Sequence, residues 1–153
     1  MFFKRLKSSI YSFFREFLVF HHSSLEFRAK LLSAVIAAKS KNLECEDKIL
    51  WDIAKKIYKN DEIRAEVLVK TVYEYIDKIR EMNDLGVDEL ILDIDKTLKK
   101  HPKFYKKIDI DMLKRFLKCK ASTEEKLLRW RVIEFLQSEL KEFSTKSKKN
   151  EKK

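Results

Sequence analysis

Cysteine, histidine and carboxylate side chains are the groups of this 153-residue chain that could do chemistry, and their spacing supports little of it. Cys45 and Cys119 form no CxxC pair and no zinc-ligand spacing with the three histidines. We therefore predict two reduced thiols in a cytoplasmic protein. The same spacing predicts no metal site and no cofactor.

Two pairs of aspartates also suggest metal chemistry at first sight. Asp93 and Asp95 stand two positions apart, as do Asp109 and Asp111. Side chains two positions apart on a helix diverge by about 200° and cannot chelate one ion, so Asp109 is better interpreted as a helix cap. No nucleophile, base and orienting group occur together at motif spacing, and we predict that the protein is not an enzyme.

The start of the chain carries the clearest binding pattern. Wound at 3.6 residues per turn, residues 1–22 form a basic helix with an aromatic stripe, suited to an anionic membrane surface or to the groove of a protein partner. In the alternative, the same helix packs back on the body and completes the core. Charged residues near position 15 interrupt the apolar run, so no spanning helix and no secretory signal is predicted. The residues predicted to contact the membrane or partner are Phe2, Phe3, Lys4, Arg5, Leu6, Lys7, Ile10, Phe13, Phe14, Arg15 and Phe17.

A second cluster, between residues 99 and 107, interleaves lysines with aromatic rings and predicts an alternative function. Lysines bind phosphates and aromatic rings stack on bases, so nucleic-acid binding is the competing hypothesis. The residues that would carry it are Lys99, Lys100, Lys103, Phe104, Tyr105, Lys106 and Lys107. The oligomeric state is left open.

Composition favours an all-α protein that positions these groups. Glycine and proline occur once each, at Gly86 and Pro102, which nearly excludes architectures that depend on tight turns. We expect Gly86 in a turn with a left-handed cap and Pro102 just after a helix end. Hydrophobic residues make up 44% of the chain, enough to fill one core.

Charge and periodicity divide the chain into three parts. The formal charge is +10, of which residues 1–20 carry +3 and the residues after Phe143 carry +4. We predict a single bundle of about seven helices, made of an N-terminal helix over 1–22 and a helical domain over 23–143, followed by a disordered basic tail over 144–153. Asn60 or Asp61, Asp109, and Ser122 or Thr123 are the predicted caps of later helices.

Aromatic and basic residues in the last helix raise the question of an interface. Arg129, Trp130 and Arg131 resemble an interface anchor with charged flanks, and Trp51 is the approximate counterpart of Trp130 earlier in the chain. Core packing is the preferred interpretation of both tryptophans.

The segments at 28–58 and 110–140 repeat one order of elements, namely a helix, a polar loop, an acidic helix start and a second amphipathic helix. This order predicts two similar helix pairs. Together with Arg28, Leu31, Leu32, Ala37, Ala38, Glu46 and Asp47, the pattern resembles the TerB-like family, named for tellurite resistance and found also at the N-terminus of membrane-anchored DnaJ-type co-chaperones.

The resemblance implies a TerB-like fold, a binding role and a link to stress response. Family members typically carry an Ala-Asp-Gly stretch in the polar loop, and their acidic residues are implicated in binding a divalent metal. Residues 38–43 here read Ala-Lys-Ser-Lys-Asn-Leu, without aspartate or glycine. Lysines in the loop would repel a hard cation, so the fold carries over and the metal site does not.

Overall fold

The computed structural model of the chain describes residues 23–81 and 85–151, and the predictions for residues 1–22 lie outside this part. The described residues contain helices and no strand, which confirms the all-α class. In chain order the helices are α3 (Ser23–Ile36), α4 (Glu44–Ile57), α5 (Glu62–Glu81), α6 (Leu85–Lys100), the 3-10 helix η1 (Pro102–Lys107), α7 (Ile110–Lys114), the 3-10 helix η2 (Arg115–Lys118) and α8 (Thr123–Glu151).

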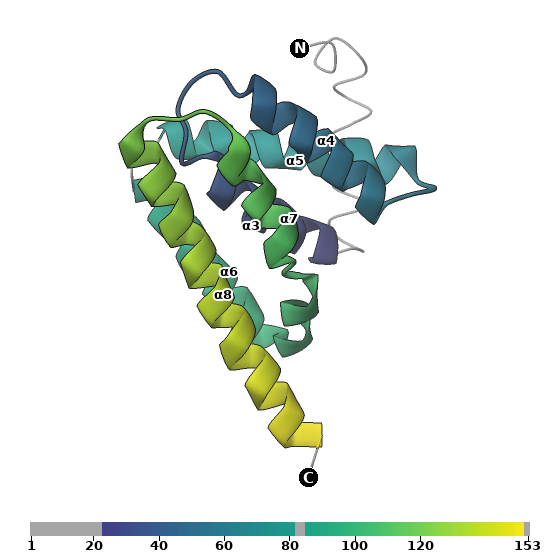
Figure 1. Cartoon of the computed structure of the whole chain (residues 1–153). Helices are drawn as coiled ribbons and strands as arrows, with labels where there is room; N and C mark the ends of the chain where they lie inside the picture. Colours follow the sequence, from purple (N-terminus) through teal and green to yellow (C-terminus); the bar gives the residue numbers. More distant parts are fainter. Residues whose placement is uncertain (1–22, 82–84, 152–153) are drawn as a thin grey trace.

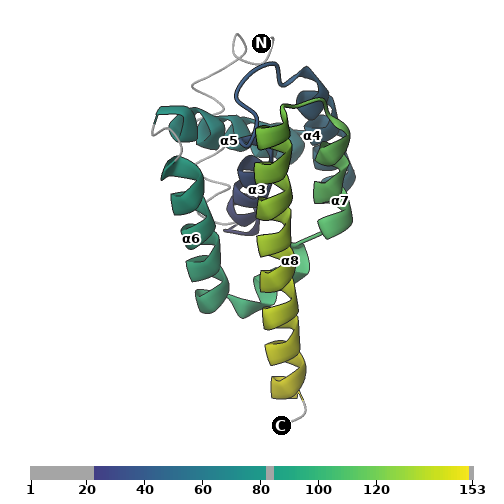
Figure 2. The same cartoon turned by 60° about the vertical axis from the view of Figure 1, so that its left-hand side comes forward.

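The central helix is α3, which lies between the other elements. It contacts α5, α6, α8 and η1, and most of its side chains are buried. Helices α4 and α5 lie across one end of the molecule, and α6 and α8 run away from that end along its length (Figures 1 and 2). The core that these helices share includes Leu25, Phe27, Leu50, Leu68, Val72, Ile94, Leu98, Phe116, Ile133 and Leu136.

Side-chain caps begin three of the helices as the sequence predicts. An oxygen of Asp61 accepts a hydrogen bond from the backbone N–H of Arg64 at 3.0 Å, and Asp109 caps α7 in the same way. At the start of α8, the Ser122 hydroxyl accepts from the N–H of Glu125 at 3.1 Å, and the Glu125 carboxylate accepts from the N–H of Ser122 at 2.9 Å. This reciprocal capping box satisfies two N–H groups at that helix end.

Gly86 has a different role from the one predicted. It lies inside α6, and no glycine of the described residues has a positive φ. A Cβ atom at this position would lie 2.8 Å from the Cα of Ile79 in α5. Glycine is therefore needed because the backbones of α5 and α6 approach closely, and not because a left-handed cap requires it.

The end of α8 also differs from the prediction, because the helix continues through residues 144–151 instead of giving way to a disordered tail. The Thr145 hydroxyl donates to the carbonyl of Lys141 at 2.8 Å, and Lys146 pairs with Glu142 at 2.9 Å. A helix that already exists extends without a new nucleation cost, and lysine and glutamate are good helix formers. The second half of α8 reaches past the rest of the molecule (Figure 1).

The prediction of reduced thiols is wrong, because Cys45 and Cys119 form a disulfide across 74 positions of the sequence. Spacing in the sequence reveals ligand sets among near neighbours, and it does not reveal two cysteines that meet only after folding. Disulfides persist mainly in oxidising environments, so the thiols no longer argue for a cytoplasmic location.

Arg129 is a core residue and not the flank of an interface anchor. Its side chain is 2% exposed, and its guanidinium donates to the carbonyls of Val35, Ile36 and Phe116 at 2.9, 3.2 and 3.0 Å. It also lies 3.1 Å from the buried carboxylate of Glu46. One side chain thus ties the ends of α3 and η2 to the start of α4.

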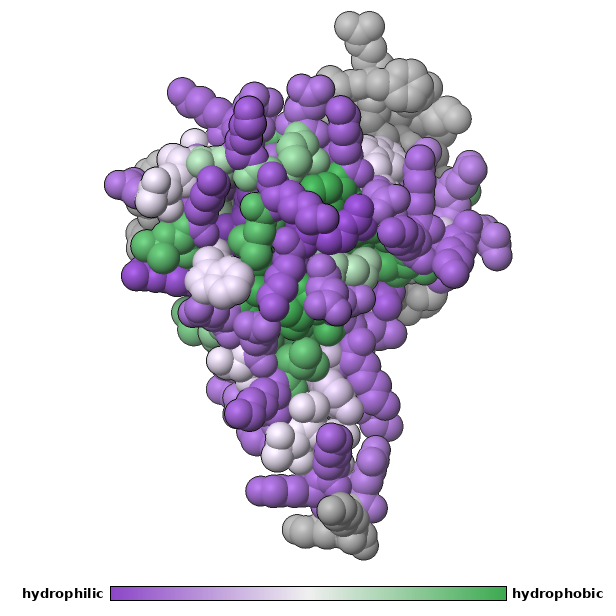
Figure 3. Space-filling view, in the orientation of Figure 1, coloured by the Kyte–Doolittle hydropathy of each residue, from purple (hydrophilic) through white to green (hydrophobic). Residues whose placement is uncertain are grey.

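The two tryptophans differ in their burial, so core packing holds for one of them and not for the other. Trp130 is exposed, so core packing is wrong for it, whereas Trp51 is half-buried and packs against the core. The face drawn in Figure 3 is largely hydrophilic, with apolar side chains in patches between charged ones. Over the described ranges, no helix combines the length and the apolar character needed to cross a bilayer.

Candidate functional site

Net positive charge is confined to one end of the described structure. This basic end consists of residues 95–107 and 139–151, which carry ten lysines against four acidic residues. The other described residues carry 19 basic and 19 acidic side chains and are therefore neutral overall. A field of one sign at one end attracts anionic partners to that end.

Three elements position these lysines. The last turns of α6 lead into η1, which begins with Pro102 at the point where α6 must stop. The 3-10 helix then lies against both α6 and α8, so that residues 95–107 meet the C-terminal half of α8. The exposed lysines of the basic end that form no salt bridge with another described residue are Lys96, Lys100, Lys103, Lys106, Lys141, Lys148 and Lys149.

Two acidic side chains join α6 and α8 beneath this surface. Glu139 is 6% exposed, and burial together with the nearby charge of Asp95 raises its pKa to about 7. Lys99 lies 2.8 Å from Asp95, and this hydrogen bond lowers the pKa of the Asp95 carboxyl. Near neutral pH, part of the Glu139 population is protonated, so the basic end is more positive than a formal count indicates.

The predicted nucleic-acid cluster is only partly assembled as a binding surface. Phe104 and Tyr105 are half-buried and pack against the core. The Phe104 ring lies 5.4 Å from that of Phe27 and 5.1 Å from that of His101. These contacts occupy the Phe104 ring, so the lysines and Tyr105 are the members of the cluster that could still contact a nucleic acid.

The described part of the chain begins with α3, whose first turns contact η1 of the basic end. Helix α3 begins at Ser23, and Phe27, four positions later, contacts Phe104 of η1. The residues predicted to contact a membrane or partner, Phe2 to Phe17, lie outside the described residues. They are followed by α3, which contacts η1 through Phe27 and Phe104.

Sequence reasoning did not place the lysines after Phe143 on α8, because it treated residues 144–153 as a separate tail. Continuing the helical pattern of α8 past Phe143 would have placed Lys146 and Lys149 one turn apart on the same rod. It would not have shown that η1 lies against that rod, since this contact joins distant parts of the chain.

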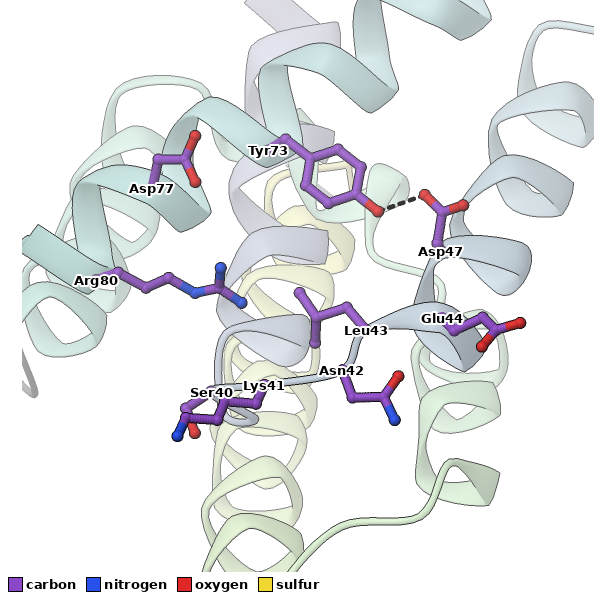
Figure 4. A pocket seen from close by; sticks show the side chains of 9 residues that line it. All are labelled: Ser40, Lys41, Asn42, Leu43, Glu44, Asp47, Tyr73, Asp77 and Arg80. Carbon is purple, nitrogen blue, oxygen red and sulfur yellow. Dashed lines mark hydrogen bonds between the residues drawn. The ribbon is translucent and has the colours of Figure 1, made fainter. Parts of the chain in front are cut away.

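A pocket of about 550 Å³ opens at the other end, between the loop after α3 and the C-terminal half of α5. Its lining is mixed in charge, and the Tyr73 hydroxyl donates to the Asp47 carboxylate (Figure 4). Burial and this hydrogen bond hold the pKa of Tyr73 well above its usual value, so the phenol stays protonated. The lining residues are Ser40, Lys41, Asn42, Leu43, Glu44, Asp47, Tyr73, Asp77 and Arg80.

This pocket does not bring a catalytic set together. Its lining contains no cysteine or histidine, and its tyrosine already donates its proton to a carboxylate. General-base or nucleophilic chemistry needs a free group aimed at a substrate position. The absence of enzymatic activity stays a prediction.

Among the described residues, the group that comes nearest to a metal-ligand set lies at the disulfide. One donor atom each of Cys45, Glu46 and Cys119 lies within 4.8 Å of the others. Both sulfurs are bonded to each other, however, and the Glu46 carboxylate faces Lys39 at 3.4 Å and Arg129 at 3.1 Å. Two cations already occupy the only carboxylate of the set, which disfavours a metal ion there.

Comparison with known proteins adds no relative to this picture. The TerB-like resemblance, with the stress-response link that it implies, stays a prediction. No family model matches the chain, and neither a curated protein nor a solved structure matches it.

Proposed function

We propose that the protein is a non-enzymatic helical binding module that attaches to an anionic membrane surface through its basic end and residues 1–22. The observation that carries the proposal is the segregation of charge, because all the net charge of the described residues belongs to the basic end. The other described residues are neutral overall, so they would not attract the molecule to an anionic membrane in a different orientation.

The proposal combines two weak attachments, one through the lysines of the basic end and one through residues 1–22. A lysine near an anionic membrane surface contributes about 1 kcal/mol, and this contribution decays within a Debye length of about 10 Å. An amphipathic segment adds the burial of its apolar face. Since residues 1–22 are followed by α3, which contacts η1, the aromatic stripe of the sequence and the lysines of the basic end can engage the same surface.

Cosedimentation with vesicles tests the charge contribution. The variant Lys100→Glu/Lys103→Glu/Lys106→Glu reverses three exposed charges of the basic end. We expect it to bind vesicles of phosphatidylcholine with about 30 mol % phosphatidylserine at least about tenfold more weakly than the wild type. Neither protein should bind vesicles of phosphatidylcholine alone to the same extent.

A matched control carries the same charge change on the neutral part of the surface. Lys55→Glu/Lys59→Glu/Lys120→Glu also replaces three exposed lysines. If net charge alone determined binding, both triple variants would lose affinity equally, and the proposal would be wrong. A chain that starts at Ser23 tests the second attachment, and pelleting equal to that of the full chain would remove residues 1–22 from the proposal.

Nucleic-acid binding by the same lysines is the alternative. It predicts a complex with duplex or single-stranded oligonucleotides that weakens steeply as salt rises. Binding of oligonucleotides without binding of anionic vesicles would replace the membrane proposal. If no oligonucleotide shows a shift in electrophoretic mobility with the protein at low salt, the alternative is wrong.

A further inference from the structure

The disulfide lies at the start of α4, a helix whose main neighbours are α5 and η2. Cys45 belongs to the first turn of α4, and Cys119 follows η2 directly. Helix α4 contacts α5 along its length and otherwise touches mainly η2. The disulfide is therefore the covalent connection between the start of α4 and the second half of the chain.

The two sulfurs differ in their access to solvent. Cys45 is partly exposed, whereas Cys119 is 2% exposed. Thiol–disulfide exchange begins with attack by a thiolate on one sulfur, so access decides which sulfur is attacked. The exposed side of this disulfide is the α4 side.

Non-covalent contacts hold the same junction and would survive the loss of the disulfide. Arg115 pairs with Asp52 at 2.7 Å, which links η2 to α4. Glu125 accepts a hydrogen bond from the N–H of Ser40 at 3.0 Å, which links α8 to the loop after α3. Partly exposed polar contacts of this kind are weak. The buried pair of Arg129 and Glu46, next to Cys45, is the stronger non-covalent restraint on the start of α4.

We propose that the Cys45–Cys119 disulfide is a thiol-exchange site that latches the start of α4 to the segment after η2. The class of reactant is an external dithiol. Its thiolate attacks the Sγ of Cys45, a mixed disulfide forms there, and the Sγ of Cys119 leaves with the electron pair and takes up a proton. The second thiol of the reactant then attacks the reactant sulfur that is bonded to Cys45 and releases the Cys45 thiolate. The reactant leaves as a cyclic disulfide, so two electrons pass to the protein.

Reduction opens the latch locally. The hydrophobic core, to which α4 contributes Leu50, Ile53 and Ala54, contains neither cysteine, so it remains packed. The start of α4 and the loop over residues 37–43 lose their covalent anchor and open more often than the rest of the fold. The opening lies beside the pocket of Figure 4, which this loop lines. This inference is independent of the membrane proposal.

Hydrogen exchange of the full chain, with and without dithiothreitol, tests the latch. We expect protection factors over residues 37–48 to fall at least about tenfold on reduction, while those over 65–76 and 130–143 change by less than about twofold. The double variant Cys45→Ala/Cys119→Ala should show the faster exchange at once and should not respond to dithiothreitol. If that variant fails to fold, the comparison within the wild-type protein still decides.

The direction of exchange has its own test. Brief treatment of the oxidised protein with a monothiol, followed by acid quenching and peptide mass spectrometry, should place the thiol adduct on Cys45. An adduct mainly on Cys119 would overturn the assigned direction. Equal loss of protection over all helices, or no loss in α4, would overturn the latch itself.

Discussion

The substitution Arg129→Met removes a core side chain that makes three hydrogen bonds and one ion pair, and it should destabilise the protein strongly. Methionine keeps much of the side-chain length while losing the charge and all donors. The carbonyls of Val35, Ile36 and Phe116 lose their donor, and the buried Glu46 keeps only Lys39, at 3.4 Å. These acceptors cannot find water in a site where Arg129 is 2% exposed.

The expected cost follows from two overlapping contributions. Breaking a buried ion pair by removing one partner costs about 3–5 kcal/mol, and a hydrogen bond to a charged group contributes about 1.5–3 kcal/mol. Because the same guanidinium serves both, the contributions do not add, and we expect about 4 kcal/mol. Domains of this size are stable by about 5–15 kcal/mol, so the variant should fold with a greatly reduced margin.

Urea denaturation of the oxidised protein, followed by circular dichroism, measures this loss. Arg131→Met is the matched control, since Arg131 is exposed on the same helix, and it should change the free energy of unfolding by less than about 0.5 kcal/mol. In a double-mutant cycle with Glu46→Gln, the combined loss should be smaller than the sum of the single losses by at least about 1 kcal/mol. A loss below about 1 kcal/mol for Arg129→Met, or strict additivity in the cycle, would refute the reasoning.

Three further predictions concern pH, packing and capping. Because the pKa of Glu139 is raised to about 7 from an ordinary 4.5, the folded state binds this proton more tightly than the unfolded chain. The resulting stabilisation is complete below the unfolded pKa and is lost as pH rises through 7. The urea midpoint should therefore fall between about pH 5 and about pH 8 by the equivalent of about 2 kcal/mol. The variant Glu139→Gln should show a smaller fall. Gly86→Ala should lower the melting temperature, although alanine normally stabilises a helix interior, because its Cβ would lie 2.8 Å from the Ile79 Cα; an increase would contradict the close-approach role. Ser122→Ala removes the acceptor for the N–H of Glu125 and should cost about 1 kcal/mol in thermal unfolding, whereas the neighbouring exposed Thr123→Ala should cost less.

Local features of the fold were predictable because their causes are local. Asp61, Asp109 and Ser122 lie directly before an apolar repeat, and each caps its helix in the structure. Pro102 likewise ends α6 within two residues, as its missing N–H requires. Such signals act within about one helical turn, so they can be recognised without knowing which other helices pack nearby.

Long-range features were not predictable in the same way. Arg129 looks like any exposed basic residue in a helical pattern, and only the arrival of the ends of α3 and η2 around it makes burial favourable. The disulfide depends on the same convergence, which spacing along the chain does not report. Part of the candidate site was predictable, since the lysines of η1 were identified from the sequence. Their position beside the C-terminal half of α8 depends on how η1 packs against that helix.

The disulfide also gives the polypeptide a topology of its own. Residues 45–119 form a covalent ring, and the segments before and after the ring, which contain α3 and α8, are two arms attached to it. A protease cut at one peptide bond inside the ring therefore leaves a single covalent molecule that separates into two fragments only after reduction. A cut in either arm releases a fragment at once, so non-reducing and reducing gels of a partial digest would report on which side of the ring the chain first becomes accessible.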